Sequence, residues 1–526
     1  MSTFSRTTRL LMAGTASMLL ASCDGADSVA SPGEGVIVAP GGGSTPTPTP
    51  TGTPTPTAGT PAASCPTGFA DAGVVGNFRG CRIPTVVTSS LTLQKLPGVA
   101  YEINGQVDVG VDIGGDGTKS GGTRVDLTVQ PGVIVYANTT NANNDFLVVN
   151  RGSRLLAEGT AASPIIFTAQ QNLTGGVSDD SQGLWGGIIM AGRAPISNCN
   201  TTVAGGSATC ENIVEGTTTA LYGGANATDD SGTVRYVQIR YSGTVISPNN
   251  ELQGLTLGGT GSGTTIDHVQ VHNSSDDGIE VFGGRTNMKY LAITGADDDG
   301  LDTDVGWQGF VQFVLAVQKP NNTQTDNYST EIDSNGNEDA LPRQRYNLAN
   351  FTFVSTSTAT NAAIRLRGGA DARFINGIVT GPNACLNIVA GLDSNGKSTI
   401  RPANTTLDDL GPPVFSSVVF GCASSYAETA VNGVTVTAAE QAAVFTAGTN
   451  NTASATGILT GTYLPAGVAS TTTPFNASTI NSFFVNTSFI GAVSGPNDTS
   501  FAGWTCNSNR ASFGSTSGSC TALPTG

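Results

Sequence analysis

The feature that most constrains the fold is a repeat of about 22 residues in the centre of the chain. Segments that begin at Thr265, Asn287 and Gly309 follow one another at this interval. Their matching apolar columns are Ile266, Met288 and Phe310; Val269, Leu291 and Phe313; and Val271, Ile293 and Leu315. Such a period, with short strands between Gly, Asn and Asp turns, is typical of one coil of a parallel β-helix. Because stacked coils place equivalent strands about 4.8 Å apart, we expect each column to be buried in a common core.

The composition agrees with a β fold and excludes some partners. Gly accounts for 69 of 526 residues, and charged residues make up only 12%. This mixture favours turns and strands over helices. Acidic residues outnumber basic ones by 39 to 23, which gives a formal net charge of −16. We therefore expect an all-β, right-handed parallel β-helix with loop insertions, and no binding to nucleic acid.

The N-terminal region indicates export and a lipid anchor. Residues 1–9 hold two cations and no acid, and the apolar stretch over 10–20 is too short to cross a bilayer. Both features are typical of a signal peptide, which we expect over residues 1–22. The stretch ends in Leu20-Ala21-Ser22-Cys23, which resembles the lipobox of bacterial lipoproteins. The resemblance implies diacylation of Cys23, which would give stable anchoring; the alternative is an ordinary signal peptide that happens to contain a cysteine.

Beyond the signal peptide, the sequence divides into four parts. We expect a lipidated, Pro/Thr-rich tether over 23–64, a β-helix body over 65–423, a low-complexity insertion over 424–482 and a C-terminal β segment over 483–526. Within the insertion, Thr437-Ala438-Ala439-Glu440 has the pattern of a capping box. It predicts a short helix that ends near Gly448.

The nine cysteines favour an oxidising compartment. With Cys23 assigned to lipid, eight remain, and eight cysteines allow 105 connectivities in principle. Sequential pairing is the simplest and gives Cys65–Cys81, Cys199–Cys210, Cys385–Cys422 and Cys506–Cys520. Each pair would close a local loop, as in exported proteins. A cysteine metal site is not expected, because the sequence contains no CxxC motif.

Several segments resemble a coil-and-turn signature of secreted right-handed β-helix proteins. They are residues 155–160 (LLAEGT), 163–168 (SPIIFT), 183–189 (GLWGGII), 250–256 (NELQGLT), 298–304 (DDGLDTD), 489–492 (FIGA) and 503–505 (GWT). Together they are similar to a family of large surface or periplasmic lipoproteins of Gram-negative bacteria, closely over 100–395 and loosely over 483–506. That family has no established activity. The resemblance therefore implies a β-helix fixed to the cell envelope, at the surface or periplasmic face of the outer membrane, and little chemistry.

An acidic ladder follows from the same repeat. The 22-residue offset stacks Asp276 on Asp298, Asp277 on Asp299, and Glu280 on Asp302. Carboxylates about 5 Å apart repel each other unless a cation lies between them or one of them binds a proton. Because oxygen ligands at this density suit Ca²⁺, the candidate calcium ligands are Asp276, Asp277, Asp298, Asp299 and Asp302. A solvated acidic ladder without an ion and a catalytic carboxylate set remain as alternatives.

Two functions on this scaffold compete. Many parallel β-helices cleave acidic polysaccharides, either as lyases with calcium and an Arg or Lys base or as hydrolases with grouped aspartates. Arg365 and Arg367 share a face of one predicted strand, which suits a lyase. However, the sequence lacks the aspartate cluster joined to His-Gly and Arg-x-Lys elements that is expected of pectin hydrolases. No acid–nucleophile set surrounds His268 or His272. We therefore favour a membrane-anchored envelope protein with a binding or structural role, whose partners are lipid and polysaccharides or envelope proteins, over a calcium-dependent lyase or glycoside hydrolase.

Overall fold

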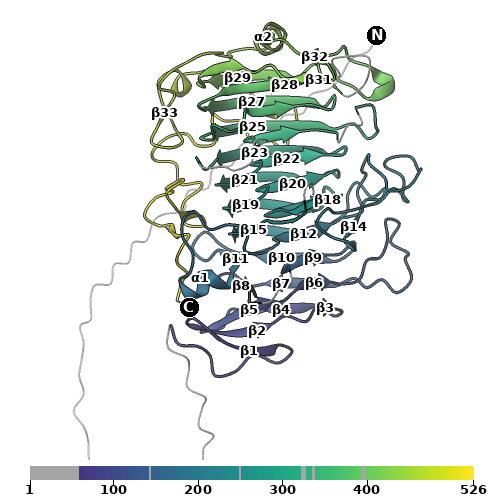
Figure 1. Ribbon diagram of the computed structural model, residues 1–526, viewed down its shortest axis with the longest axis vertical. Helices are drawn as coiled ribbons and strands as arrows, with labels where there is room; N and C mark the ends of the chain where they lie inside the picture. The colour runs from purple at the N-terminus through teal and green to yellow at the C-terminus, as the bar shows by residue number, and fades with distance from the viewer. Residues whose placement is uncertain are drawn as a thin grey trace, which may run out of the picture. The chain divides into compact units, whose positions relative to one another are not determined.

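The chain folds into an all-β parallel β-helix, in which each strand pairs with its equivalent in the next coil (Figure 1). The computed structural model describes residues 59–140, 144–247, 250–320, 327–334, 338–391 and 399–525. One ladder runs through β2 (Phe78–Arg82), β5 (Val99–Ile103), β8 (Ile134–Ala137), β11 (Ile165–Ala169), β15 (Gly232–Arg240), β19 (Thr265–His272), β21 (Asn287–Thr294), β23 (Gln308–Val317), β25 (Arg345–Val354), β27 (Asp371–Thr380) and β29 (Val414–Phe420).

A second ladder forms another face of the coils. It runs through β3 (Val86–Val87), β6 (Gln106–Val109), β9 (Phe146–Val149), β12 (Ile188–Ala191), β18 (Leu255–Gly258), β20 (Ile279–Phe282), β22 (Leu301–Asp304), β24 (Thr330–Ile332), β26 (Ala362–Leu366), β28 (Ala384–Ile388) and β30 (Ser424–Tyr426). Because β30 pairs with β28, the ladder continues into the segment 424–482 that the sequence suggested was an insertion. Short hairpins lie outside the ladders: β13 (Asn212–Ile213) with β14 (Leu221–Tyr222), β16 (Thr244–Ser247) with β17 (Asn250–Leu252), β31 (Ala430–Val431) with β32 (Val434–Thr435), and β33 (Leu459–Thr460) with β34 (Leu464–Pro465).

From β15 onward, one long strand takes the place of two short ones. In the first coils, β4 (Leu91–Leu93), β7 (Asp126–Val129) and β10 (Arg154–Glu158) form a separate short ladder. β15 pairs with β10 through its first half and with β11 through its second half. Between the halves, Tyr236 has a φ of 51°, a left-handed conformation that bends the strand around the corner. The equivalent positions with positive φ in later coils are His268, Tyr290, Phe313, Asn350, Asn376 and Ser417.

The 22-residue period holds between β19 and β21, where Ile266 pairs with Met288 as predicted. It fails at the next coil, because Met288 pairs with Val311 and not with Phe310. The predicted core positions of Phe310, Phe313 and Leu315 are therefore wrong. The chain from Leu301 to Val311 is one residue longer than the equivalent chain from Ile279 to Met288 in the coil before. A slip of one residue moves every side chain to the opposite face of the strand. The core columns of β23 are instead Val311, Val314 and Ala316.

Both ends of the coil stack are covered. At one end, β1 (Ala70–Val75) pairs antiparallel with β2. At the other end lies α2 (Ala438–Thr446), whose Phe445 is fully buried and stacks on Phe420 with ring centroids 4.3 Å apart (Figure 1). The predicted capping box is present, since Thr437 and Glu440 exchange side-chain-to-backbone hydrogen bonds. Such caps protect the open ends of a solenoid from water.

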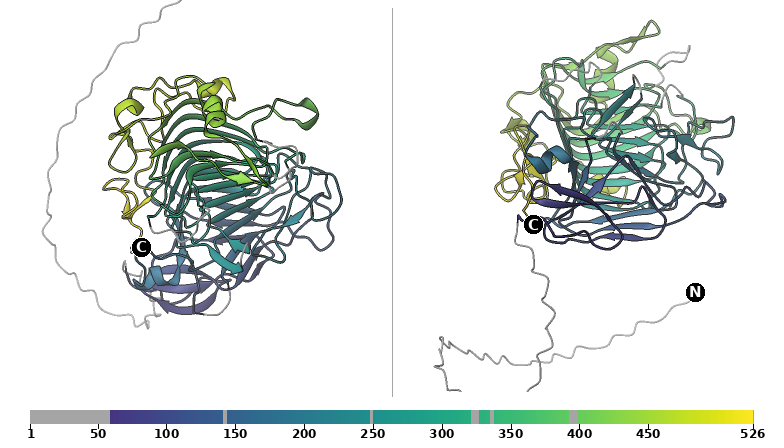
Figure 2. Two further views of the ribbon diagram at one scale, coloured as in Figure 1. Left: turned by 45° about the horizontal axis from the view of Figure 1, so that its top comes forward. Right: turned by 60° about the horizontal axis from the view of Figure 1, so that its bottom comes forward.

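The last part of the chain, residues 473–525, runs back along the outside of the coils, and we call it the C-terminal strap (Figures 1 and 2). Side-chain amides on the coils hold it by two-point hydrogen bonds to its backbone. Gln270 donates to the Cys506 carbonyl and accepts from the Cys506 amide. Gln312 holds Val485 in the same way, and Asn376 holds Phe475. Residues 483–526 were expected to form a β segment, but over the described residues 483–525 only β35 (Cys506–Asn507) and β36 (Gly518–Ser519) are strands, because these amides replace a neighbouring strand as partners.

The structure contains all four sequential disulfides: Cys65–Cys81, Cys199–Cys210, Cys385–Cys422 and Cys506–Cys520. The predicted signal peptide, Cys23 and nearly all of the tether lie outside the described residues. Among the residues that are described, no helix is long and apolar enough to span a membrane.

Candidate functional site

An outward-facing column of polar residues runs along the second ladder. Ile279 and Val281 of β20 fill the core, so the side chain between them, Glu280, points away from it. Strand pairing aligns equivalent positions from coil to coil in the order Thr256, Glu280, Asp302, Glu331, Arg365 and Asn387. Three carboxylates and a guanidinium therefore follow one another along this face.

The turns before β20 and β22 add further carboxylates. The Asp299 amide donates to Oδ1 of Asp277 over 2.8 Å, which brings the two turns together as the repeat predicted. The glycine that follows Asp277 is required by this stacking. A Cβ atom on Gly278 would lie 2.4 Å from a methyl carbon of Ile293 and 2.7 Å from the carbonyl oxygen of Gly300. The Asp-Asp-Gly sequence thus combines close coil packing with a dense set of carboxylates.

These groups surround a cavity of about 330 Å³, which we call the acidic pocket. Its described lining contains eleven carboxylates and one arginine. The lining residues are Glu215, Glu251, Gln253, Asp276, Asp277, Glu280, Phe282, Asp298, Asp299, Asp302, Asp304, Glu331, Asp333 and Arg367. All five predicted calcium ligands are among them.

Two carboxylate triads in the pocket have the spacing of a metal site. One consists of Asp277, Glu280 and Asp302, and the other of Asp277, Asp298 and Asp299. In each triad, one oxygen per residue lies within 4.8 Å of the others, a separation that Ca²⁺ bridges with bonds of about 2.3–2.6 Å. Of the predicted ligands, Asp276 lines the pocket but belongs to neither triad found among the described residues, whereas Glu280 is an additional candidate.

The sequence reasoning missed several lining residues that come from outside the simple repeat. Glu215 lies in the β13–β14 hairpin and Glu251 on β17, both of which belong to excursions from the coils. Glu331 does follow the ladder, but the chain makes a longer connection between Asp302 and Glu331, its partner in the pairing. Because of this longer connection, a search at a fixed period does not align Asp302 with Glu331.

Burial strongly disfavours the charged forms of these acids in the absence of a cation. It raises the pKa of Glu215 to about 7, and that of Asp276 to about 8, where Glu251 and Glu215 add repulsion. Burial is also the main reason why the pKa is raised well above its usual range at Asp277, Glu280, Asp299, Asp302 and Asp304. The metal-free pocket therefore holds protons near neutral pH, and a divalent cation would compete with them.

Two arginines neutralise one end of the pocket. Nε of Arg367 lies 2.8 Å from Glu331 and 2.9 Å from Asp333, and Nε of Arg365 lies 3.4 Å from the same oxygen of Glu331. Their common partner agrees with the prediction that the two arginines share a face. The carboxylates of the two triads lie on earlier coils than this cationic end.

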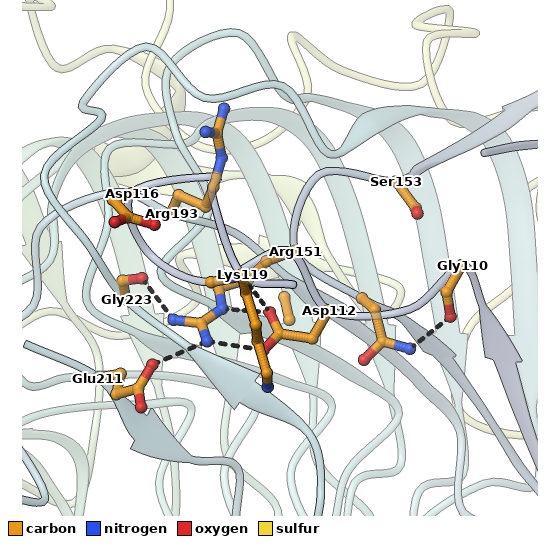
Figure 3. Close-up of polar contacts among 12 residues, drawn as sticks. Gly110, Asp112, Asp116, Lys119, Arg151, Ser153, Arg193, Glu211 and Gly223 are labelled. Carbon is orange, nitrogen blue, oxygen red and sulfur yellow. Dashed lines mark hydrogen bonds and ion pairs between the residues drawn. The ribbon is translucent and has the colours of Figure 1, made fainter. Parts of the chain in front are cut away.

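A second cluster of charges, around Arg151, is balanced and serves as a contrast (Figure 3). Arg151 is fully buried, and its guanidinium makes two hydrogen bonds to Asp112, one to Glu211 and one to the carbonyl of Gly223. Nζ of Lys119 lies 2.8 Å from Oδ2 of Asp112, which also accepts from Arg151. Two cations thus match two acids, as expected for a structural ion-pair network. The acidic pocket lacks this balance.

The two histidines lie apart from the pocket lining. His272 is fully buried and its Nδ1 lies 2.9 Å from the hydroxyl of Thr294. Burial, with repulsion from Arg240 and Arg510, lowers the pKa of His272 to about 3. His268 is stacked against the ring of Tyr290 and contacts Asp267. Neither residue supplies a group to the pocket.

Comparison with known proteins identifies the family. A family model described as a pectate-lyase-like beta-helix domain matches residues 97–463. No curated protein and no solved structure gives a match. The matched region is more than half of the chain and includes every residue of the acidic pocket. The chain therefore belongs to the pectate-lyase-like β-helix domain family.

Proposed function

We propose that the protein is an exported lipoprotein whose β-helix binds calcium in the acidic pocket and has a binding or structural role in the cell envelope. The observation that carries the calcium proposal is the excess of carboxylates, eleven against one arginine, around a single cavity. Desolvated carboxylates that outnumber the nearby cations are costly, and hard oxygen ligands in this number suit Ca²⁺ better than Mg²⁺. The resemblance to Gram-negative envelope lipoproteins supports the lipid anchor at Cys23 and a location at the outer membrane.

A bound calcium ion would neutralise adjacent coils and offer positive charge to an acidic ligand. The two triads that contain Asp277 are suited to hold it, because β20 and β22 and the turns before them fix these side chains. Acidic polysaccharides are the ligand class that a bound Ca²⁺ would bridge to the pocket, because the net charge of −16 on the protein repels them when no cation is bound. Envelope proteins are the other partner class.

Thermal unfolding of the purified full chain tests the calcium proposal. Millimolar Ca²⁺ added after EDTA should raise the unfolding midpoint, and Mg²⁺ should raise it less. A hundredfold excess over Kd corresponds to about 2.7 kcal/mol. The double variant Asp277→Asn with Asp299→Asn should lose the response, whereas Asp230→Asn, an exposed acid outside the pocket, should keep it. An unmoved wild-type midpoint, or an equal shift in the double variant, would refute calcium binding at this site.

A calcium-dependent polysaccharide lyase is the second candidate function. It is favoured by the family and by Arg365 and Arg367, which contact Glu331 of the pocket. Its test is incubation with acidic polysaccharides and Ca²⁺, in which new absorbance at 235 nm signals a lyase and new reducing ends signal a hydrolase. If neither new absorbance nor new reducing ends appear, the binding or structural role is favoured.

The anchor has its own test. Cys23→Ala should leave the protein soluble or unprocessed, because the acylated residue would be missing. Cys65→Ala is the control, since it removes a cysteine of the folded body and should leave membrane partitioning unchanged. Full partitioning of the Cys23 variant with membranes would show that the anchor assignment is wrong.

A further inference from the structure

We propose that the acidic pocket holds two divalent cations, bridged by the carboxylate of Asp277. This inference rests on the proposed calcium binding and deepens it. The first cation site consists of Asp277, Glu280 and Asp302, and the second of Asp277, Asp298 and Asp299.

The two triads extend from Asp277 in different directions of the fold. Glu280 and Asp302 are outward-facing, paired residues of β20 and β22. Asp298 and Asp299 belong to the turn that precedes β22. Each triad already satisfies the oxygen spacing of one ion, and a shared carboxylate is how two-metal sites hold ions about 3.5–4 Å apart.

Gln253 supplies an independent indication of a ligand at the first site. Its side chain is 1% exposed and lines the pocket. Its Nε2 donates to Glu215 and to Glu280, which fixes the orientation of the amide. Its Oε1 has no hydrogen-bond partner among the described residues. A buried carbonyl oxygen of this kind needs a donor or a cation, and amide oxygens are regular ligands of Ca²⁺.

Asp302 gives a similar indication. Its Oδ1 is buried and has no hydrogen-bond partner in the described part of the chain. The neighbouring triad residue Glu280 receives the amide of Gln253. The first site thus offers three carboxylates, with the unpartnered amide oxygen of Gln253 in the same pocket lining. Waters or a ligand would complete the six to eight positions that Ca²⁺ takes.

Charge balance favours two ions over one. The two triads together contain five carboxylates. One Ca²⁺ would leave three uncompensated negative charges in a desolvated cavity, whereas two would leave one. Arg367 lies in the lining near Glu331 and Asp333, which it already neutralises in part. The second ion is therefore the group that removes most of the remaining repulsion.

The stoichiometry of calcium binding tests the inference without any mutation. Metal-free full-length protein is dialysed to equilibrium against CaCl₂, and bound calcium is measured per chain. Two ions per chain are expected. One ion per chain would overturn the second site and leave the calcium proposal intact, while none would overturn both. Mixed loading with Tb³⁺ and Eu³⁺ should give energy transfer between the two ions within one chain, and its absence would also contradict a bridged pair.

Matched variants locate the two ions. Glu280→Gln removes a ligand from the first site only, and Asp298→Asn removes one from the second site only. Each should reduce the stoichiometry from two to one. Asp230→Asn is the control, because it removes an exposed carboxylate that lies outside the acidic pocket, and it should retain two ions. Two ions in both ligand variants would overturn the assignment.

Discussion

The pocket carboxylates make the metal-free protein sensitive to pH. Their folded-state pKa values are raised, to about 7 for Glu215 and about 8 for Asp276, so the folded state binds more protons than the unfolded state above pH 4. Stability in EDTA should therefore fall as pH rises from about 4 to about 8. Urea unfolding at pH 5 and pH 8 measures this fall, and Asp276→Asn should reduce it. Saturating Ca²⁺ should reduce it, because the ligand carboxylates would then be ionised in the folded state as well; a stability that is independent of pH in EDTA would contradict the buried acids.

His272 produces a pH dependence of the opposite sign. Its pKa is about 3 when folded and about 6.5 when unfolded, so the unfolded state binds one more proton between these values. The stability of the wild type relative to His272→Gln should therefore decrease on acidification, approaching about 1.4 kcal/mol per pH unit below pH 6. Urea unfolding of both proteins from pH 7 to pH 5, with Ca²⁺ present, measures the difference. A constant difference would mean that the imidazole is not buried in its neutral form.

At the level of single strands, the register of β23 separates two adjacent side chains. Val314 is fully buried in the core, whereas Phe313 packs on the outer side with Trp504 and Phe501 of the strap. Val314→Asp should abolish folding, because a buried unpaired charge costs several kcal/mol. Phe313→Asp should keep the far-ultraviolet circular dichroism of the β-helix and loosen the strap, which limited proteolysis detects. If Phe313→Asp abolished folding and Val314→Asp did not, the 22-residue register would be correct for β23.

Local repetition made part of the fold and of the pocket predictable. The pairing of β19 with β21, the contact of Asp277 with Asp299 and the capping box of α2 all follow from short-range patterns. One added residue in a connection was enough to mislead the assignment of Phe313. Glu215 and Gln253 could not be assigned, because they meet the pocket through hydrogen bonds across an excursion of the chain. Fixed-period reasoning fails wherever turn length changes.

For the molecule as a whole, the C-terminal strap joins coils that are far apart in the sequence. Gln270→Leu removes both hydrogen bonds to Cys506, and we expect a loss of about 1–3 kcal/mol, since it leaves backbone groups unpaired. Hydrogen exchange should speed up over residues 500–510. Gln94→Leu, which replaces an exposed glutamine of an early coil, is the control. Unchanged exchange in the Gln270 variant would show that the amide contact does not hold the strap.

The strap also sets an order of events during biosynthesis. Coils pair mainly with the coil before them, so they can form as the chain emerges from the N-terminus onward. The ring of Tyr290 contacts Phe501, and Phe313 belongs to the same apolar cluster. These rings and the amides of Gln270 and Gln312 are covered only by residues made last. A chain that still lacks the strap would therefore expose these apolar side chains to chaperones and proteases. The coil stack is therefore fully covered only when the C-terminal residues have emerged and folded onto it.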